Sequence, residues 1–464
     1  MPDVIQFVDA MSANPGVLLD MNDDVALRTR LIAAPPPRLR RTTVQNAMSD
    51  GEYVSSSTYG GRLLTLDVDV ITSTQDQNAA LLQKVARLID RPESFIRYQP
   101  AGHSRPGFLR TTRADIAELV NVISTLAFRQ LRVELPADPF MLGLRQTISV
   151  GTVNNDPAAG SNGCYFDVTN VRGDVAAPMV MVDTGTIKPN VILAVTQGTN
   201  AADFPVVFQG ESMNFEDADT ANPGGAADAA MSGSGSTNYA RTSFATSTSL
   251  STLRLTALAG SNAAARALRG THRALLTVRR TEAASTIAVR TYQVVNDTIV
   301  EGDTLTVPLT TNRQIVDLGM FTFGLGQAIS PDMVPGTSLT FQASRSGGAG
   351  SLQWDCLQYI PADYATCVLS GLSSGFTGGA DLVFDGEHEQ VVSVTTGTSI
   401  FSGGTAEGRL APFSGSIPKL KPGVTNRFTY LKWDAAAQLV DKAVTGSVTL
   451  YYQPRYLYVP TQSS

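Results

Sequence analysis

The fold of the first part of the chain is decided by residues 62–115, which read RLLTLDVDVITSTQDQNAALLQKVARLIDRPESFIRYQPAGHSRPGFLRTTRAD. Apolar residues occupy every second position from Leu64 to Val70, which is typical of a strand with one face buried and the other in water. A segment of helical period follows, and Gly102 and Pro106 then mark the turn of a hairpin. This order predicts one helix packed on a β-sheet.

The helix is expected to begin after Thr74, with Gln77 three residues later completing a capping box, and to end before Pro92. Its buried face is predicted to comprise Leu81, Leu82, Val85, Ala86, Leu88 and Ile89. Burying each large side chain on the sheet contributes about 1.5–3 kcal/mol, whereas a helix of this length would not persist alone in water.

The composition favours a mainly β protein. Charged residues make up 16% of the 464 residues and glycine contributes 40, while short runs of Val, Leu, Ile and Tyr recur throughout. No run approaches the length of a membrane span, and the first residues lack the features of a secretory signal. Residues 1–145 hold 16 basic and 16 acidic side chains, so we expect no basic patch suited to sequence-specific nucleic-acid binding.

Helical patterns nearly vanish after about residue 146. Strand-like runs separated by Gly-rich turns recur from there to the end, which is typical of sandwiches and jelly rolls. One low-complexity stretch, DTANPGGAADAAMSGSGSTN at 219–238, is expected to form a long loop. Residues 116–126 are ambiguous between helix and strand.

Several segments resemble the distal tail proteins and related minor tail proteins of long-tailed siphophages. The N-terminal matches are DGEYVSSSTYGGRLLTLDVDV at 50–70, LLQKVARLID at 81–90, RYQPAGHSRPGFLRTTRAD at 97–115 and LRVELPADPFMLG at 131–143. Further matches are CYFDVTNVRGDVAAPMVMV at 164–182, GSIPKLKPGVTNRF at 415–428 and SVTLYYQPRYLYV at 447–459. Together they cover about half of the chain.

The resemblance implies a mainly β architecture in three parts. Residues 1–145 would form a ring-forming β-sandwich with one packed α-helix, and residues 146–200 and 371–464 a second β-sandwich. Residues 201–370 would be an inserted jelly roll, recognised by its strand rhythm, of the sort that such tail proteins use as accessory and in some cases sugar-binding modules.

The function implied by the resemblance is that of a structural component of the phage tail tip, located in the virion. Copies of the chain would form a ring, expected to be a homohexamer, that joins the tail tube to the tip complex. The implied partners are the chain itself, the tail tube protein, and the tail tip hub and tape measure proteins, with a host-surface glycan as a further candidate. A carbohydrate-binding or carbohydrate-cleaving β-sandwich protein is the alternative.

A candidate ring interface lies around the hairpin. Arginine dominates there, since Lys84 is the only lysine in the first 145 residues, and arginine forms bidentate pairs with carboxylates better than lysine does. The candidate residues are Arg97, Arg105, Arg110, Arg113, Asp67 and Asp69. We expect the arginines of one copy to meet the two aspartates of the next, with ordinary exposed strand charge as the alternative.

We expect no enzymatic activity and no catalytic, cofactor or metal site. Residues 371–375, GLSSG, match the nucleophile-elbow pattern, but a strand-like run follows where that chemistry needs a helix. Residues 387–389, a histidine between two glutamates, have side chains that can bind a metal, but a metal site needs about three converging ligands and neighbours along a strand point to opposite faces. A solvated turn after Asp385-Gly386 is therefore expected. His103 and His272 are expected at a surface or an interface.

Three further groups of residues have both a possible functional role and a purely structural explanation. The acidic run at 211–219 has the oxygen ligands that calcium prefers, but solvated loop charge is the default. Trp354, Tyr359 and Tyr364 are candidates for stacking on a sugar. However, Trp354 alternates in step with Leu352 and Cys356, which favours packing of its side chain in the core. A Cys356–Cys367 disulfide is conceivable, while burial of Cys356 is the simpler expectation.

Overall fold

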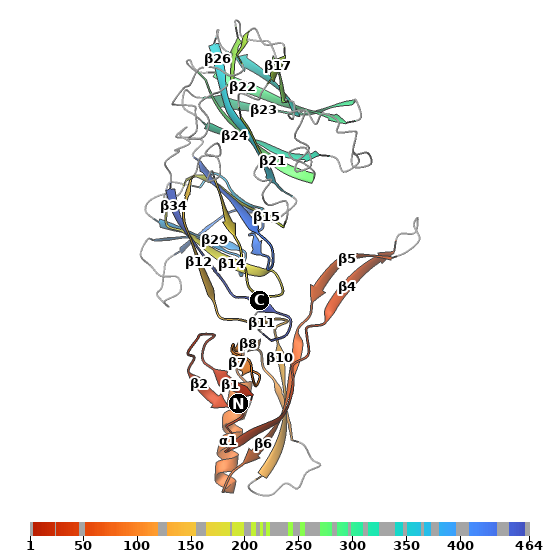
Figure 1. The fold of residues 1–464 in the computed structure, drawn as a ribbon, viewed down its shortest axis with the longest axis vertical. Helices are drawn as coiled ribbons and strands as arrows, with labels where there is room; N and C mark the ends of the chain where they lie inside the picture. Colours follow the sequence, from red (N-terminus) through yellow and green to blue (C-terminus); the bar gives the residue numbers. More distant parts are fainter. Residues whose placement is uncertain are drawn as a thin grey trace. The chain divides into compact units, whose positions relative to one another are not determined.

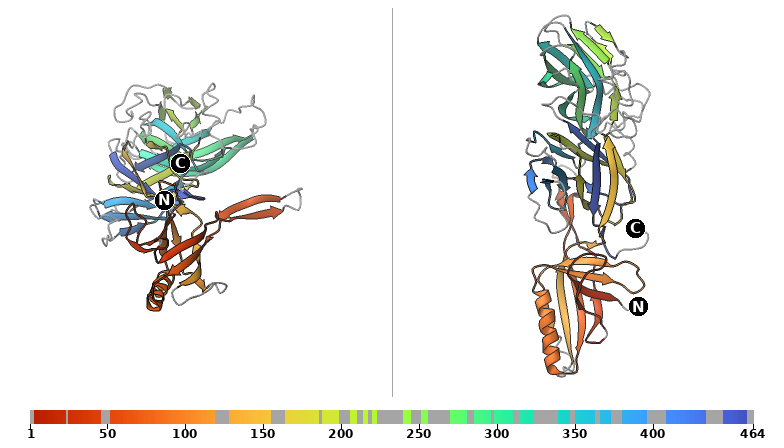
Figure 2. Two further views of the ribbon diagram at one scale, coloured as in Figure 1. Left: turned by 60° about the horizontal axis from the view of Figure 1, so that its bottom comes forward. Right: turned by 90° about the vertical axis from the view of Figure 1, so that its left-hand side faces the viewer.

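The computed structural model describes residues 3–23, 25–45, 52–118, 128–154, 164–185, 188–198, 206–209, 214–216, 220–222, 240–244, 251–255, 270–280, 285–295, 298–309, 314–323, 339–346, 350–362, 366–372, 380–395, 408–433 and 445–459. The fold is mainly β, as the sequence predicts, with many short strands and one helix in these ranges (Figures 1 and 2). No helix within them has the length and apolar character of a membrane span.

Contacts divide the chain into two compact units. The first comprises Met1–Gln146, Val171–Ala177 and Tyr452–Ser464, and the second comprises Thr147–Asn170 and Pro178–Tyr451. The chain therefore crosses between the units at four positions.

The first unit is built on one large sheet with strand order β2-β1-β7-β8-β10-β6-β3. β9 and β11 pair with β10 and β8, and β35 pairs with β11. The bounds are β1 (Val4–Val8), β2 (Val17–Asp20), β3 (Leu27–Ala33), β6 (Arg62–Ile71), β7 (Ser94–Gln99), β8 (Gly107–Thr111), β9 (Asp115–Glu118), β10 (Phe128–Ala137), β11 (Met141–Leu142) and β35 (Arg455–Tyr456). A separate hairpin consists of β4 (Leu39–Gln45) and β5 (Glu52–Tyr59).

Helix α1 (Gln75–Ile89) is the predicted helix. Thr74 caps its first turn by accepting a hydrogen bond from the Gln77 N–H, but the Gln77 side chain bonds Ser73 instead of returning to Thr74. The fully buried face is Asn78, Val85, Leu88 and Ile89. Ala86, predicted to be buried, is exposed because the helix presents position 85 to the sheet and turns position 86 outward.

The core of the first unit lies between α1 and the sheet. The buried leucines and valines of β6 and β10 pack there, and Figure 2 shows the helix along the strands. Tyr456 and Val459 from the end of the chain belong to this same core. Residue-by-residue pairing of β6 with β10, from Ile71↔Phe128 to Arg62↔Ala137, fixes the register.

The C-terminal segment is tied to the first unit by backbone hydrogen bonds. Met141 and Leu142 pair with Tyr456 and Arg455, and the Asp174 N–H donates to the Arg455 carbonyl at 2.8 Å. Gly173 has φ +117°, and a Cβ there would lie 2.9 Å from the Arg455 carbonyl oxygen. Only glycine fits this close approach without strain.

The second unit contains a sandwich of two sheets. The seven-stranded sheet has the path β12-β34-β14-β28-β29-β30, with β32 beside β14, and the five-stranded sheet has the order β13-β33-β15-β27-β31. The first consists of β12 (Gln146–Asn154), β14 (Ala177–Asp183), β28 (Ala380–Asp385), β29 (Gln390–Thr395), β30 (Gly408–Ala411), β32 (Lys419–Leu420) and β34 (Thr445–Tyr452). The second consists of β13 (Tyr165–Val168), β15 (Asn190–Gln197), β27 (Thr366–Leu369), β31 (Ser414–Gly415) and β33 (Asn426–Trp433).

Residues 206–361 supply two more sheets of the second unit. One has the order β18-β19-β26-β21-β24 with β16 beside β26, and the other β17-β20-β25-β22-β23. The first consists of β16 (Val206–Gln209), β18 (Thr220–Asn222), β19 (Ala240–Phe244), β21 (Gly270–Arg280), β24 (Gln314–Phe323) and β26 (Gly350–Pro361). The second consists of β17 (Asn214–Glu216), β20 (Ser251–Leu255), β22 (Ser285–Val295), β23 (Thr298–Leu309) and β25 (Leu339–Ser346).

The three-part division expected from the sequence stays a prediction. Within the second unit, Leu275, Ile315 and Ile360 of the expected insert share a buried cluster with Ile192 and Trp433 of the five-stranded sheet. The end of the chain, from Tyr452, belongs to the first unit. Residues 220–222, expected in a loop, form β18, and β9 resolves the start of the ambiguous 116–126 segment as strand.

Candidate functional site

A two-stranded arm leaves the sheet of the first unit. β4 and β5 pair only with each other, starting at Leu39↔Tyr59, and Figures 1 and 2 show the arm extending away from the sheet. At its base the Gly60 N–H donates to the Arg38 carbonyl at 2.8 Å, and Tyr59 makes an edge contact with Phe140. Every strand side chain of the arm that the structure describes is exposed.

The sheet of the first unit ends in two different edges, β2 and β3, in the described strand order. Backbone donors and acceptors along an edge can pair with a strand of another chain. Exposed apolar side chains follow these edges, with Val17 on β2, Leu31 on β3, and Leu63 and Ile71 on the neighbouring β6. Two unlike edges with apolar flanks suit contact between copies of the chain.

The two predicted interface aspartates pair within the chain. Asp67 accepts two hydrogen bonds from Arg132 on the facing strand, at 2.8 and 2.9 Å, and these bonds hold the pKa of Asp67 below its usual range. Asp69 is buried, accepts from Gln130 at 2.8 Å and forms an ion pair with Arg30. The carboxylates therefore link β3, β6 and β10.

The predicted interface arginines lie on β7, on β8 and in the turns beside them. Arg97 bonds Gln6 at 3.3 Å, and Arg110 lies 3.0 Å from Glu93. Arg113 donates to the Asp90 carbonyl at 3.0 Å, whereas Arg105 is half-exposed in the hairpin turn.

Because β10 stands between β8 and β6 in the sheet, the arginines and the aspartates do not gather in one patch of a single subunit. A contact between the arginines of one copy and the aspartates of another stays a prediction. Of the two aspartates, Asp69 is the less able to make such a contact, because its side chain is buried.

The nucleophile-elbow pattern is followed by a strand in the part of the chain that the structure describes. Gly371 and Leu372 follow β27, and residues 373–375 lie outside the described ranges. The next described element is the strand β28, as the sequence predicts, where the elbow needs a helix.

Residues 387–389 form the turn of the β28–β29 hairpin, which confirms the prediction for this cluster. Asp385 Oδ1 accepts from the backbone N–H of Glu387 and of His388, and its Oδ2 lies 2.7 Å from His388 Nδ1. The carboxylate thus organises the turn, and these bonds lower its pKa although burial opposes them.

The remaining sequence candidates offer no site among the described residues. Tyr359 is buried, and burial raises its pKa well above the ordinary tyrosine value, so its ring is not accessible to a sugar. His272 is buried and not at the surface as expected, because β21 lies between β24 and β26, while His103 is exposed.

Cys367 is a free buried thiol, so the conceivable disulfide is not formed. The side chains of Trp354, Cys356 and the acidic run, and residue Tyr364, lie outside the described set. In the ranges that are described, no three His, Cys, Asp or Glu side chains gather closely enough to hold a metal ion.

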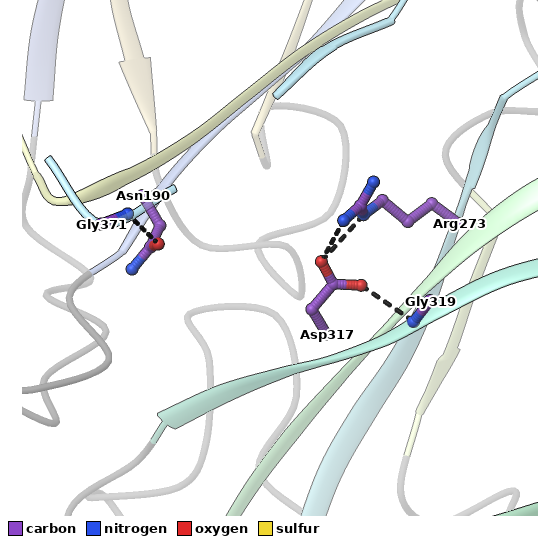
Figure 3. A network of polar contacts seen from close by, with 5 residues as sticks. All are labelled: Asn190, Arg273, Asp317, Gly319 and Gly371. Atoms are coloured by element: carbon purple, nitrogen blue, oxygen red, sulfur yellow. Dashed lines mark hydrogen bonds and ion pairs between the residues drawn. The ribbon is translucent and has the colours of Figure 1, made fainter. Parts of the chain in front are cut away.

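Figure 3 shows polar contacts at two places in the second unit, an irregularity in the pairing of β24 with β21 and the segment that follows β27. Arg273 on β21 donates to Asp317 on β24 at 2.9 and 2.5 Å, and Asp317 also accepts from the Gly319 N–H at 3.0 Å. The Gly371 N–H donates to Asn190 at 3.1 Å. These contacts are structural, since each polar group meets another part of the fold.

The sequence pattern alone assigns no role to the arm. Its signal was present, because Asp50-Gly51 is a strong turn pair between the Thr- and Val-containing run 39–45 and the Ser- and Tyr-containing run 52–59. The exposure of both strands could not be read from the sequence, because it depends on where the rest of the sheet ends.

No protein-family model and no curated protein matches the sequence. Among solved structures, the chain is similar to the SPP1 Dit (gp 19.1) protein, described as a paradigm of the hub adsorption apparatus in phages that infect Gram-positive bacteria, with 9% identity and a TM-score of 0.35 over 98% of this chain and 99% of that chain. A chain of the phage P2 baseplate in its activated conformation with Ca has 8% identity and a TM-score of 0.26 over 78% and 99%.

A third similarity is to the CBM22-1 xylan-binding domain of Paenibacillus barcinonensis Xyn10C, with 11% identity and a TM-score of 0.22 over 33% of this chain and 91% of that domain. At identities and TM-scores this low, none of the three similarities assigns a function to the chain.

Proposed function

We propose that the chain is a structural component of the tail tip of a long-tailed phage, in which the first unit assembles head-to-tail with copies of itself into a closed ring. The sequence resemblance at 50–70, 81–90, 97–115 and 131–143 suggests this setting. The observation that carries the proposal is the arm β4–β5, which projects from the sheet with exposed side chains.

An isolated two-stranded hairpin is only marginally stable in water. The described strand side chains of the arm are exposed, and Tyr59 gains a contact with Phe140 at the base. Docking on a neighbouring copy would bury the surface that the arm leaves open to solvent. The edges β2 and β3 are unlike surfaces, and a contact between unlike surfaces is heterologous, which closes into a ring when the rotation per subunit allows it.

In this assembly the ring, expected to be a hexamer, would join the tail tube to the tip complex. The tail tube protein and the hub and tape measure proteins would be its neighbours, and the second unit would serve as the peripheral module that faces the host. The neutral charge of residues 1–145 suits a ring that lets DNA pass without binding it. The proposal gives the chain no enzymatic role.

The test is the oligomeric state of the full-length protein, measured by native mass spectrometry and negative-stain imaging over a range of concentrations. Leu39→Lys places a charge on the arm, where Leu39 is 42% exposed, and Leu410→Lys places the same charge on the second unit, where Leu410 is 66% exposed. We expect rings for the wild type and the control, and dissociation for Leu39→Lys.

A wild-type protein that stays monomeric at every concentration and binds no tail component would contradict the proposal. Sugar binding on a glycan array by such a monomer would favour the carbohydrate-binding alternative. If rings form in both lysine variants, self-assembly would be supported, but the proposed contact through the arm would be contradicted.

A further inference from the structure

Two oppositely charged side chains meet in the core between the sheets of the sandwich. Asp183 is the last residue of β14 in the seven-stranded sheet, and Lys432 lies on β33 in the five-stranded sheet. Lys432 Nζ donates a hydrogen bond of 2.7 Å to Asp183 Oδ2, and the two side chains are 3% and 0% exposed. The pair therefore connects two strands that belong to separate hydrogen-bonded sheets.

Buried aromatic side chains surround the pair, and the carboxylate of Asp381 is close enough to Asp183 for their charges to interact. Tyr430 is fully buried and donates its hydroxyl to the same Asp183 Oδ2 at 2.6 Å, and its ring centre lies 5.4 Å from Lys432 Nζ. Phe384 packs edge-on against that ring. Moving two charges from water into such a core costs several kcal/mol per ion, which their attraction recovers only with good geometry. A covalent bond that removes both charges removes this cost.

The two oxygens of Asp183 have different partners. Oδ1 accepts a hydrogen bond of 2.9 Å from the Gly185 backbone N–H, whereas Oδ2 accepts from both Tyr430 and Lys432. Oδ1 is therefore held by a backbone N–H, which is the kind of donor that stabilises the oxygen of an acyl-transfer intermediate. Oδ2 lies beside two groups that can carry a proton.

We propose that Lys432 and Asp183 form an intramolecular amide bond that joins the two sheets of the sandwich. The hydrogen bond brings the amine nitrogen close to the carboxyl carbon, near the roughly 3–3.5 Å separation from which held groups react. The reaction happens once in each molecule, so it is a self-modification and not turnover of a substrate.

The atoms balance without any co-reactant. The Lys432 ammonium first gives a proton to Asp183 Oδ2, which leaves a neutral amine and a carboxylic acid. The amine nitrogen then attacks the Asp183 carbonyl carbon, and the negative charge that develops on Oδ1 is stabilised by the Gly185 N–H. A second proton passes from the nitrogen to the Oδ2 hydroxyl, the C–Oδ2 bond breaks, and one water molecule leaves an amide.

Tyr430 is placed to relay the second proton, because its hydroxyl already bonds the leaving oxygen. Burial first, and the neighbouring Asp183 carboxylate second, raise the pKa of Tyr430 well above the ordinary tyrosine value. The hydroxyl therefore keeps its proton at physiological pH and can donate one proton while it accepts another. In this scheme Tyr430 is a positioning and relay residue that forms no bond to the product.

The test is the mass of the intact full-length protein, measured by electrospray mass spectrometry after denaturation. We expect the wild type to be lighter than its sequence by one water molecule, and a digest to contain the peptides of Asp183 and Lys432 joined together. A folded wild type with the full sequence mass would overturn the proposal.

Two variants separate this bond from other losses of water, such as ring closure at an Asp-Gly pair. Lys432→Met removes the amine and should restore the full mass. Tyr430→Phe keeps the volume of the ring and should leave a large fraction of the protein at full mass, with folding checked by circular dichroism. A water loss that persists in Lys432→Met arises elsewhere and contradicts the assignment. If Lys432→Met does not fold, the joined peptide in the wild type and its reduction in Tyr430→Phe decide the question.

Discussion

The C-terminal segment is predicted to hold the first unit together, although it lies far in sequence from the rest of that unit. Tyr456 is 2% exposed and belongs to the core formed by α1 and the sheet. Tyr456→Ala would remove a buried aromatic ring, a change that costs about 3–5 kcal/mol of unfolding free energy when the site does not collapse. In a unit of this size each kcal/mol lowers Tm by about 2–4 °C.

A matched control lies two residues away, because Tyr458 is 60% exposed. Differential scanning calorimetry of the full-length protein should show the transition of the first unit lowered by Tyr456→Ala and nearly unchanged by Tyr458→Ala. The transition of the second unit should stay in place, since its core is separate. Equal effects of the two alanines, or a fall confined to the second unit, would refute this account of the C-terminal segment.

Three further outcomes follow from the described geometry. Gly173→Ala should lower the same transition, since its Cβ would meet the Arg455 carbonyl and its φ of +117° is strained for alanine by about 1–3 kcal/mol. Hydrogen bonds from Arg132 lower the pKa of Asp67 from its ordinary value of 3.8. The pair therefore stabilises the fold above that value, and its contribution is lost as the pH falls through the lower pKa of the folded state. In urea titrations, the unfolding free energy of Asp67→Asn should depend less on acid pH than that of the wild type. Burial raises the pKa of Cys367 to about 12, so iodoacetamide should label it only after denaturation, and rapid labelling of the native protein would contradict its buried position.

The local pattern of the sequence is enough to predict the helix and the strands around it. Thr74 caps α1 because its hydroxyl reaches the Gln77 N–H, and this depends on adjacent residues alone. The alternation in β6 likewise requires only that one face be buried. The exposed Ala86 was mispredicted because the apolar period of a helix defines a broad stripe, and only the sheet beneath it selects which side of the stripe is covered.

Long-range features were beyond the local pattern. β35 is only two residues long, so its sequence does not predict that it pairs with β11, which lies about three hundred residues earlier in the chain. The run NRFTYLKW of β33 is buried at almost every position, which is the mark of a strand covered on both faces. The sequence did not predict this burial, because the run contains Asn426, Arg427, Thr429 and Lys432, and ordinary burial habits would leave such residues in water.

The four crossings between the units have a consequence for resistance to proteolysis. A protease that cuts one connecting segment still leaves three peptide connections between the units, and the two pieces of chain stay together through the core contacts of each folded unit. All four connections must be severed before one unit can be shed from the other. The protein is therefore expected to tolerate nicking by proteases that would release a domain carried on a single linker.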